Sequence, residues 1–125
     1  MTKVLVIDDE DIVRLTLCQM LEAAGYEVTE ASDGRKGVAM QAGDPADIVL
    51  TDILMPGQEG IETIVQLRQL TPGVKVIAIS GGARVNNVDL LEVARAMGAD
   101  AVLAKPFTMR ELIGALDDCI GGQPA

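Results

Sequence analysis

The chain has 125 residues, and its nineteen acidic residues against ten basic ones give a net charge of −9 at pH 7. Such a surface repels nucleic acid phosphates and anionic lipids, so we expect neither nucleic acid nor a membrane as a partner. Histidine is absent, which excludes imidazole chemistry, and no apolar stretch is long enough to span a bilayer, so we expect a cytoplasmic protein.

Short apolar runs alternate with amphipathic segments along the chain. The predicted strands are residues 4–7, 27–31, 48–51, 76–79 and 101–104. The predicted helices are residues 13–24, 34–42, 61–67, 91–97 and 109–116, and we expect Gly25 and Gly98 to end two of them. This alternation predicts an α/β fold, a doubly wound parallel sheet with helices on both faces. The first, third and fourth strands are solidly apolar and suit its centre, while strand 27–31 alternates in polarity and suits an edge.

The length of the chain fits one domain, which we expect to span residues 1–121, with residues 122–125 as a short tail. Cys18 and Cys119 fall inside predicted helices, and we expect both to be buried thiols in a reducing compartment. The start at Met1 favours a stand-alone domain over a piece excised from a longer protein.

Polar residues follow four of the predicted strands at the point where each strand ends. They are Asp8 and Asp9 after the first strand, Asp52 after the third, Ser80 after the fourth and Lys105 after the fifth. Taken singly, each has a plain structural explanation, such as an aspartate that caps the next helix. The carboxyl ends of parallel strands meet at one edge, however, and open α/β sheets bind ligands there. Three carboxylates, a hydroxyl and an ammonium group at one place predict a site for Mg²⁺ and a phosphoryl group.

These residues, together with segment 52–60 and the motif Lys105-Pro106-Phe107, resemble the receiver domain of bacterial two-component response regulators. The resemblance covers residues 3–120 and implies a flavodoxin-like five-stranded sheet with strand order 2-1-3-4-5. It also implies a signalling phosphoacceptor rather than an enzyme that turns over a separate substrate. The phosphoryl donor would be a sensor histidine kinase or a histidine phosphotransfer protein. The signal would reach a downstream protein target by altered binding or by onward phosphotransfer.

The resemblance assigns a role to each acidic residue. Asp52 would be the phosphoacceptor. The side chains of Asp9 and Asp52 and the main-chain carbonyl of Leu54 would bind Mg²⁺ directly, while Asp8 would act mainly through water. The protein would then contribute by positioning the reactants and screening charge during an in-line transfer.

The same resemblance makes Ser80 a switch hydroxyl that moves to the phosphoryl group and makes Lys105 a clamp on another phosphoryl oxygen. It also implies that the Lys105–Pro106 peptide is cis. Val102 stands where the family usually carries a tyrosine or phenylalanine that rotates inward with the hydroxyl residue. Valine is stiff at χ1 and small, so we expect an intact phosphorylation site with an altered relay through the last two helices.

Two further departures concern the loops around the site. Leu54 and Gly82 stand where receiver domains often carry polar side chains that orient the hydrolytic water. Our hypothesis is that the aspartyl phosphate is relatively long-lived. Segment 80–87 bears glycines that ease large changes of φ and ψ, so it is a candidate moving element. An equally weighted alternative is that the segment is merely a loose surface loop.

Three other functions compete for this sequence. A dinucleotide-binding enzyme needs a glycine fingerprint after the first strand, but residues 8–10 are acidic and would repel pyrophosphate. A phosphatase with an aspartyl nucleophile would usually show an acid two residues after Asp52, where Leu54 stands. A degenerate receiver that serves as a constitutive protein-binding adaptor shares the fold. The complete set of site residues argues against it, and Val102 argues for it.

Overall fold

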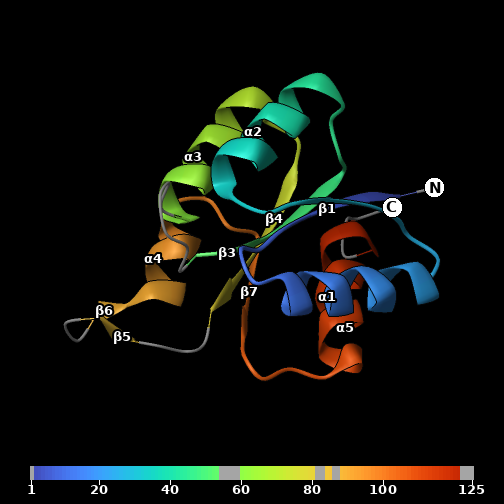
Figure 1. The fold of residues 1–125 in the computed structure, drawn as a ribbon. Coiled ribbons are helices and arrows are strands. Elements are labelled where there is room, and N and C mark those ends of the chain that lie inside the picture. Colours follow the sequence, from blue (N-terminus) through green and yellow to red (C-terminus); the bar gives the residue numbers. More distant parts are fainter. Residues whose placement is uncertain (1, 54–59, 81–83, 86–87, 122–125) are drawn as a thin grey trace.

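The computed structural model describes residues 2–53, 60–80, 84–85 and 88–121. Its centre is a five-stranded parallel sheet with the order β2-β1-β3-β4-β7 (Figure 1). The strands are β1 (Lys3–Ile7), β2 (Glu27–Ala31), β3 (Ile48–Asp52), β4 (Lys75–Ser80) and β7 (Ala101–Ala104). The helices are α1 (Asp11–Ala23), α2 (Gly34–Gly43), α3 (Gly60–Leu70), α4 (Leu90–Ala96) and α5 (Met109–Gly121). Because β7 is the fifth strand of this sheet, the predicted α/β fold and its strand order 2-1-3-4-5 are confirmed.

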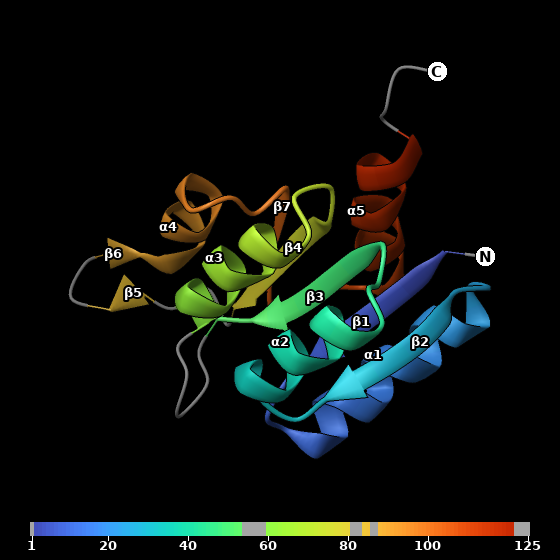
Figure 2. The ribbon, with the colours of Figure 1, turned by 90° about the horizontal axis from the view of Figure 1, so that it is seen from above.

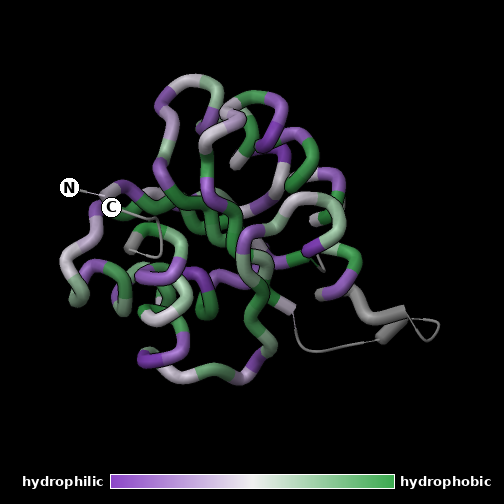
Figure 3. Tube along the Cα trace, turned by 180° about the vertical axis from the view of Figure 1, so that it is seen from behind, coloured by the Kyte–Doolittle hydropathy of each residue, from purple (hydrophilic) through white to green (hydrophobic). Residues whose placement is uncertain are grey.

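Helices cover both faces of the sheet, so every central strand is buried on two sides (Figure 1). Helices α2, α3 and α4 lie on one face, around a buried cluster that includes Leu5, Ile7 and Ile64. Helices α1 and α5 lie on the other face, around a cluster that includes Val6 and Leu17. Since successive side chains of a strand point to opposite faces, β1 supplies both clusters and is apolar from Val4 to Ile7. Figure 3 shows this concentration of hydrophobic residues along the central strands.

The exposure of each strand follows its place in the sheet, seen from above in Figure 2. Strands β1, β3 and β4 lie at the centre and are buried, apart from the half-buried Lys3 and Lys75 at their starts. Strand β2 forms one edge and exposes Glu27 and Glu30. The expectation of an apolar centre with residues 27–31 at an edge is therefore confirmed.

Gly25 and Gly98 follow the ends of α1 and α4, as predicted. Their φ angles are 95° and 120°, in the left-handed region that glycine adopts without steric penalty. The N–H of Gly25 donates to the carbonyl of Glu22 at 3.0 Å, which satisfies one of the free carbonyls at the helix end. Among the described residues, no helix combines the length and the apolar character needed to cross a bilayer.

Cys18 and Cys119 are free thiols, and both are buried, as expected. Burial raises the pKa of the Cys18 thiol to about 11, and the neighbouring Glu30 carboxylate adds to the rise. Burial likewise raises the pKa of Cys119. Both sulfurs are therefore protonated at neutral pH and pack as small apolar groups.

A two-stranded antiparallel sheet lies between β4 and α4, in a stretch where the sequence predicts a glycine-bearing connection over residues 80–87. Its strands are β5 (Arg84–Val85) and β6 (Val88–Asp89). Strands of two residues are too short to show an alternating pattern, so no pattern in the sequence predicts them. The candidate moving element includes residues 81–83 and 86–87, which lie outside the described residues.

Candidate functional site

Four of the predicted site residues meet at the carboxyl end of the parallel sheet. Asp8 follows the last residue of β1, and Asp52 is the last residue of β3. Ser80 is the last residue of β4, and Lys105 follows the last residue of β7. Neighbouring strands are paired in a register that brings their ends level. The four side chains therefore come from different strands and share one end of the sheet, the usual place for ligands in such folds.

Lys105 lies between two buried carboxylates. Its Nζ atom is 3.1 Å from Oδ2 of Asp52 and 3.6 Å from Oδ2 of Asp8. Asp8 is 1% exposed and Asp52 is 4% exposed. The main chain of Lys105 is also held, because its N–H donates to the carbonyl of Ser80 at 2.6 Å, and the Lys105–Pro106 peptide is cis, as expected. An ammonium group between two acids offsets the repulsion that would oppose their joint ionisation.

The pKa values of Asp8 and Lys105 reflect this arrangement. Burial raises the pKa of Asp8, and the charges of Asp52 and Asp9 raise it further. The main-chain N–H of Glu10 and the ammonium of Lys105 oppose that rise without cancelling it. Burial alone would lower the pKa of Lys105, but its hydrogen bond to Asp52 and that residue's charge outweigh burial, so the net pKa is raised. Lys105 therefore stays charged at neutral pH, while ionised Asp8 is disfavoured by its surroundings.

Two buried oxygen atoms at this end of the sheet have no hydrogen-bond partner among the residues that the structure describes. They are Oδ2 of Asp8, which is paired with the Lys105 ammonium at 3.6 Å but accepts no hydrogen bond from any described residue, and Oγ of Ser80. An unsatisfied buried polar group costs about 1–3 kcal/mol, so such groups call for an explanation by function. A carboxylate oxygen suits a cation, and a hydroxyl group suits an anion to which it can donate.

Asp8, Glu10 and Asp52 form an acidic cluster that fits a divalent cation. One carboxylate oxygen from each lies within 4.8 Å of the other two. The main-chain N–H of Glu10 donates to Oδ1 of Asp8 at 2.9 Å, which fixes the turn and leaves Oδ2 available to a ligand. Carboxylate oxygens are the preferred protein ligands of Mg²⁺ and Ca²⁺. The donor set and the unsatisfied Oδ2 atom together fit such an ion.

The acidic cluster differs in one member from the metal ligands that the sequence predicts. Asp9 is half-buried and does not belong to the cluster, while Glu10 does. Leu54, whose carbonyl is the other predicted ligand, lies outside the described residues. The sequence analysis assigns no role to Glu10, although it belongs to the acidic run from Asp8 to Asp11. The run does not tell which side chains of the turn face the site, so the role of Asp9 stays a prediction.

Gly60 brings the start of α3 close to the end of β3. A Cβ atom at this position would lie 2.1 Å from Cα of Ile53 and 2.8 Å from the carbonyl oxygen of Asp52. The N–H of Ile53 donates to the carbonyl of Ile79 at 3.0 Å, which ties the residue after Asp52 to the neighbouring strand. The main chain at Asp52 is thus fixed from both sides, and its carboxylate is presented from a rigid position.

Val102 is half-buried and packs against the core cluster that contains Ala78 and Ala94. It is paired with Ala78 across β4 and β7. The small aliphatic side chain is therefore part of the packing between the sheet and α4.

Comparisons with known proteins match one family over most of the chain. The family model of the response regulator receiver domain matches residues 4–117. The transcriptional regulatory protein PdtaR of Mycobacterium tuberculosis is 36% identical over 118 residues, which cover 92% of this chain and 55% of that protein. The chain therefore spans about half the length of the curated relatives that it matches.

Solved structures show the same fold. A CheY-like response regulator receiver domain protein from Methanospirillum hungatei has a TM-score of 0.89 at 31% identity, covering 98% of this chain and 96% of that one. A response regulator protein from Burkholderia pseudomallei, solved with a phosphorylated aspartic acid, a calcium ion and citrate, has a TM-score of 0.83 at 26% identity. That match covers 98% of this chain and 71% of the other.

Proposed function

This chain belongs to the response regulator receiver family of two-component signalling, and from that membership we propose that Asp52 accepts a phosphoryl group from a sensor histidine kinase or a histidine phosphotransfer protein. The observation that carries the proposal is the buried Asp52 carboxylate at the end of β3, with the Lys105 ammonium 3.1 Å away. The phosphorylated aspartic acid in the similar Burkholderia protein supports it.

In the proposed transfer, the bond between phosphorus and the donor's histidine nitrogen breaks, and a bond between phosphorus and a carboxylate oxygen of Asp52 forms. Such transfers pass through a loose, in-line transition state, so the protein contributes position and charge. Lys105 would neutralise a phosphoryl oxygen once the Asp52 carboxylate has become an acyl phosphate. The hydroxyl of Ser80 would donate to another phosphoryl oxygen, which would satisfy its unpaired Oγ atom.

We propose Mg²⁺ as the cofactor, held by Asp8 and Asp52. The further ligands would be the carboxylate of Glu10 or, as the family resemblance implies, the carboxylate of Asp9 and the carbonyl of Leu54. Bound there, Mg²⁺ would supply positive charge to the phosphoryl oxygens. The chain's own part is to hold the carboxyl groups close together at one end of the sheet. Burial raises the pKa of Asp8, and a bound cation would offset the cost of its ionised form.

An apolar groove of about 300 Å³ beside Lys105 is the place where we propose that the donor protein docks. Its lining residues are Ile12, Val13, Thr16, Leu17, Met20, Lys105, Pro106 and Phe107. Ile12 is 81% exposed and Leu15, on the same helix, is 54% exposed. Large exposed apolar side chains beside a reactive group are typical of a protein contact.

The output side of the proposal is a protein contact as well. We propose that residues 1–121 act as one receiver unit whose phosphorylation changes its binding to a downstream protein target or is passed onward. This unit would accelerate its own phosphorylation and dephosphorylation and no other reaction. The net charge of −9 disfavours a direct contact of this unit with nucleic acid.

Intact-mass spectrometry tests the phosphoacceptor role. The protein is incubated with acetyl phosphate and Mg²⁺, and the Asp52→Asn variant serves as the control. We expect one phosphoryl adduct on the wild type and none on the variant. The absence of an adduct at saturating donor would instead support the second candidate, a constitutive adaptor, which the aliphatic Val102 at the relay position favours.

A further inference from the structure

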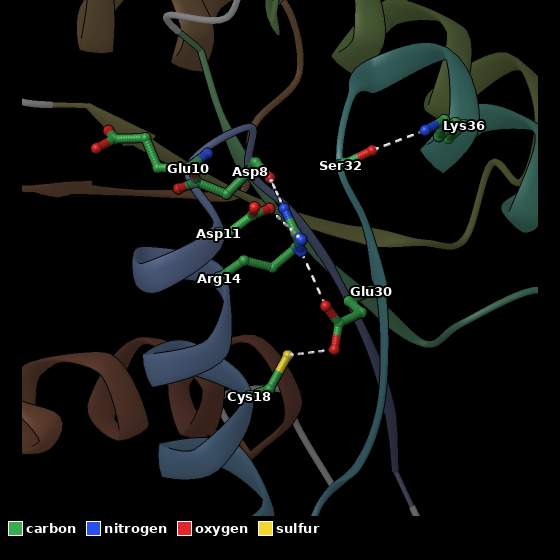
Figure 4. Close-up of polar contacts among 8 residues, drawn as sticks. All are labelled: Asp8, Glu10, Asp11, Arg14, Cys18, Glu30, Ser32 and Lys36. Carbon is green, nitrogen blue, oxygen red and sulfur yellow. Dashed lines mark hydrogen bonds and ion pairs between the residues drawn. The ribbon is translucent and has the colours of Figure 1, made fainter.

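Arg14 contacts none of the proposed reacting atoms, yet its guanidinium joins three segments around the acidic cluster. Its Nη1 atom donates to the main-chain carbonyl of Asp8 at 2.8 Å. Its Nη2 atom donates to Oδ1 of Asp11 at 2.6 Å, and its Nε atom donates to Oε1 of Glu30 on β2 at 2.8 Å. Figure 4 shows Arg14 between these groups. The Arg14 side chain is 14% exposed, whereas those of its partners Asp11 and Glu30 are 85% and 50% exposed.

The carbonyl that Arg14 holds belongs to Asp8, whose carboxylate is one of the three in the acidic cluster. Asp8 is otherwise tied to its surroundings by its N–H, which donates to the carbonyl of Ala31 at 3.2 Å, and by Oδ1, which accepts from Glu10. The contact with Arg14 fixes the other end of the same residue. Because the peptide after this carbonyl leads directly into the acidic turn, a shift there would move the carboxylates relative to Asp52.

We propose that Arg14 is a positioning residue for the cation site, which it maintains by holding the main chain of Asp8 in place. The proposal rests on the proposed function, because it assumes that the acidic cluster binds Mg²⁺. Glu30 has a supporting role, since its carboxylate accepts the hydrogen bond from Nε of Arg14 and so orients the guanidinium. Groups that orient metal ligands from outside the ligand set typically change metal affinity about 10–100-fold when they are removed.

The charge of Arg14 predicts the opposite effect, so the sign of the change distinguishes positioning from electrostatics. A guanidinium close to the acidic cluster repels a second cation, and its removal on charge alone would strengthen Mg²⁺ binding. If Arg14 positions the ligands, its removal weakens Mg²⁺ binding despite the loss of repulsion.

The test is Mg²⁺ titration by calorimetry on the wild type and on Arg14→Gln, Arg14→Lys and Glu30→Gln. We expect Arg14→Gln to weaken binding roughly tenfold. Arg14→Lys should weaken it as well, because an ammonium group lacks the planar fork that reaches three acceptors. Glu30→Gln should have a smaller effect. Arg35→Gln, which removes an exposed arginine from α2, is the control for net charge and should bind like the wild type.

Binding as tight as in the wild type, or tighter, in Arg14→Gln would overturn the proposal, and so would full affinity in Arg14→Lys. Urea unfolding without metal shows whether each variant folds. If Arg14→Gln does not fold, the Mg²⁺ affinity of Arg14→Lys decides the question. The control Arg35→Gln should also reach the wild-type yield of phosphorylation at saturating Mg²⁺, because Arg35 lies on α2 and outside the acidic cluster. If the wild type binds no Mg²⁺, the cation site itself is overturned. If the wild type binds Mg²⁺ and the Arg14 variants bind it with the same affinity, only the role of Arg14 is overturned.

Discussion

The Nζ atom of Lys105 lies 3.1 Å from Oδ2 of Asp52, so an ion pair joins the segment after the edge strand β7 to the end of the central strand β3. Strand β4 lies between these two strands, and the carbonyl of its last residue, Ser80, accepts the N–H of Lys105. This ion pair therefore spans three neighbouring strands, β3, β4 and β7. Its geometry depends on their register.

Replacing Lys105 by alanine should destabilise the protein without metal. Two buried carboxylates would lose their cation, and we expect the free energy of unfolding to fall by about 2 kcal/mol. Urea unfolding without Mg²⁺ measures this. Saturating Mg²⁺ should narrow the difference, because a bound cation offsets the same charges. Lys36→Ala, an exposed lysine on α2, is the control and should change stability by less than about 0.5 kcal/mol.

The Asp8→Asn variant should be more stable than the wild type at neutral pH without metal. Burial raises the pKa of Asp8 above its ordinary value of 3.8, so the folded protein binds the proton more tightly than the unfolded chain. The contribution of Asp8 to stability is therefore fully present below pH 3.8 and is lost as the pH rises through the folded pKa. Asparagine does not ionise, so the variant does not lose this stability as the pH rises.

Urea midpoints of Asp8→Asn and the wild type, measured between pH 4 and pH 7 without metal, check this prediction. The two curves should separate as the pH rises, by about 1 kcal/mol at neutral pH. Mg²⁺ should stabilise the wild type more than the variant, since the variant lacks a carboxylate at the cluster. A variant less stable than the wild type throughout this range would contradict the argument.

The Gly60→Ala variant should lose stability and phosphorylation together. A Cβ atom would lie 2.1 Å from Cα of Ile53, so either α3 or the main chain after Asp52 has to move. Overpacking of this kind costs about 1–3 kcal/mol. Gly43→Ala is a matched control at the end of α2, because a Cβ atom there meets nothing within 4 Å. Thermal unfolding and the yield of phosphorylated protein should fall in the first variant and hold in the second.

The aspartyl phosphate should be long-lived, because Leu54 and Gly82 lack polar side chains that could orient the hydrolytic water. These two positions lie outside the described residues, so the prediction rests on the sequence. A time course of the purified phosphoprotein by intact-mass spectrometry measures the lifetime, and Leu54→Asn should shorten it. Complete loss of the phosphoryl group within seconds in the wild type would contradict the prediction.

The positions of the strands, and of the polar residues that follow them, could be predicted because burial on both faces of the sheet makes each central strand a short apolar run. A parallel strand covered by helices on both faces is apolar along its buried length, so residues 4–7 of β1 and residues 48–50 of β3 appear as apolar runs. The first acidic residue after each run, Asp8 or Asp52, then has to lie at the carboxyl end of the sheet. The short hairpin of β5 and β6 has no such pattern and was missed.

The direction of each side chain in the acidic turn could not be predicted in the same way. Glu10, rather than Asp9, joins Asp8 and Asp52 in the cluster, although Asp9 and Glu10 are neighbours in the same acidic run. The main chain of the turn is held by Arg14 from α1, and no local pattern indicates that contact.

The sequence by itself determined which chemical groups gather at one end of the sheet, because apolar runs and their lengths place each strand's end. The tertiary structure decided which atoms meet there. Lys105 reaches a carboxylate 53 positions away, and Arg14 reaches Glu30 16 positions away. Those contacts depend on strand register and helix packing, which arise from long-range burial of the two core clusters and not from any local pattern.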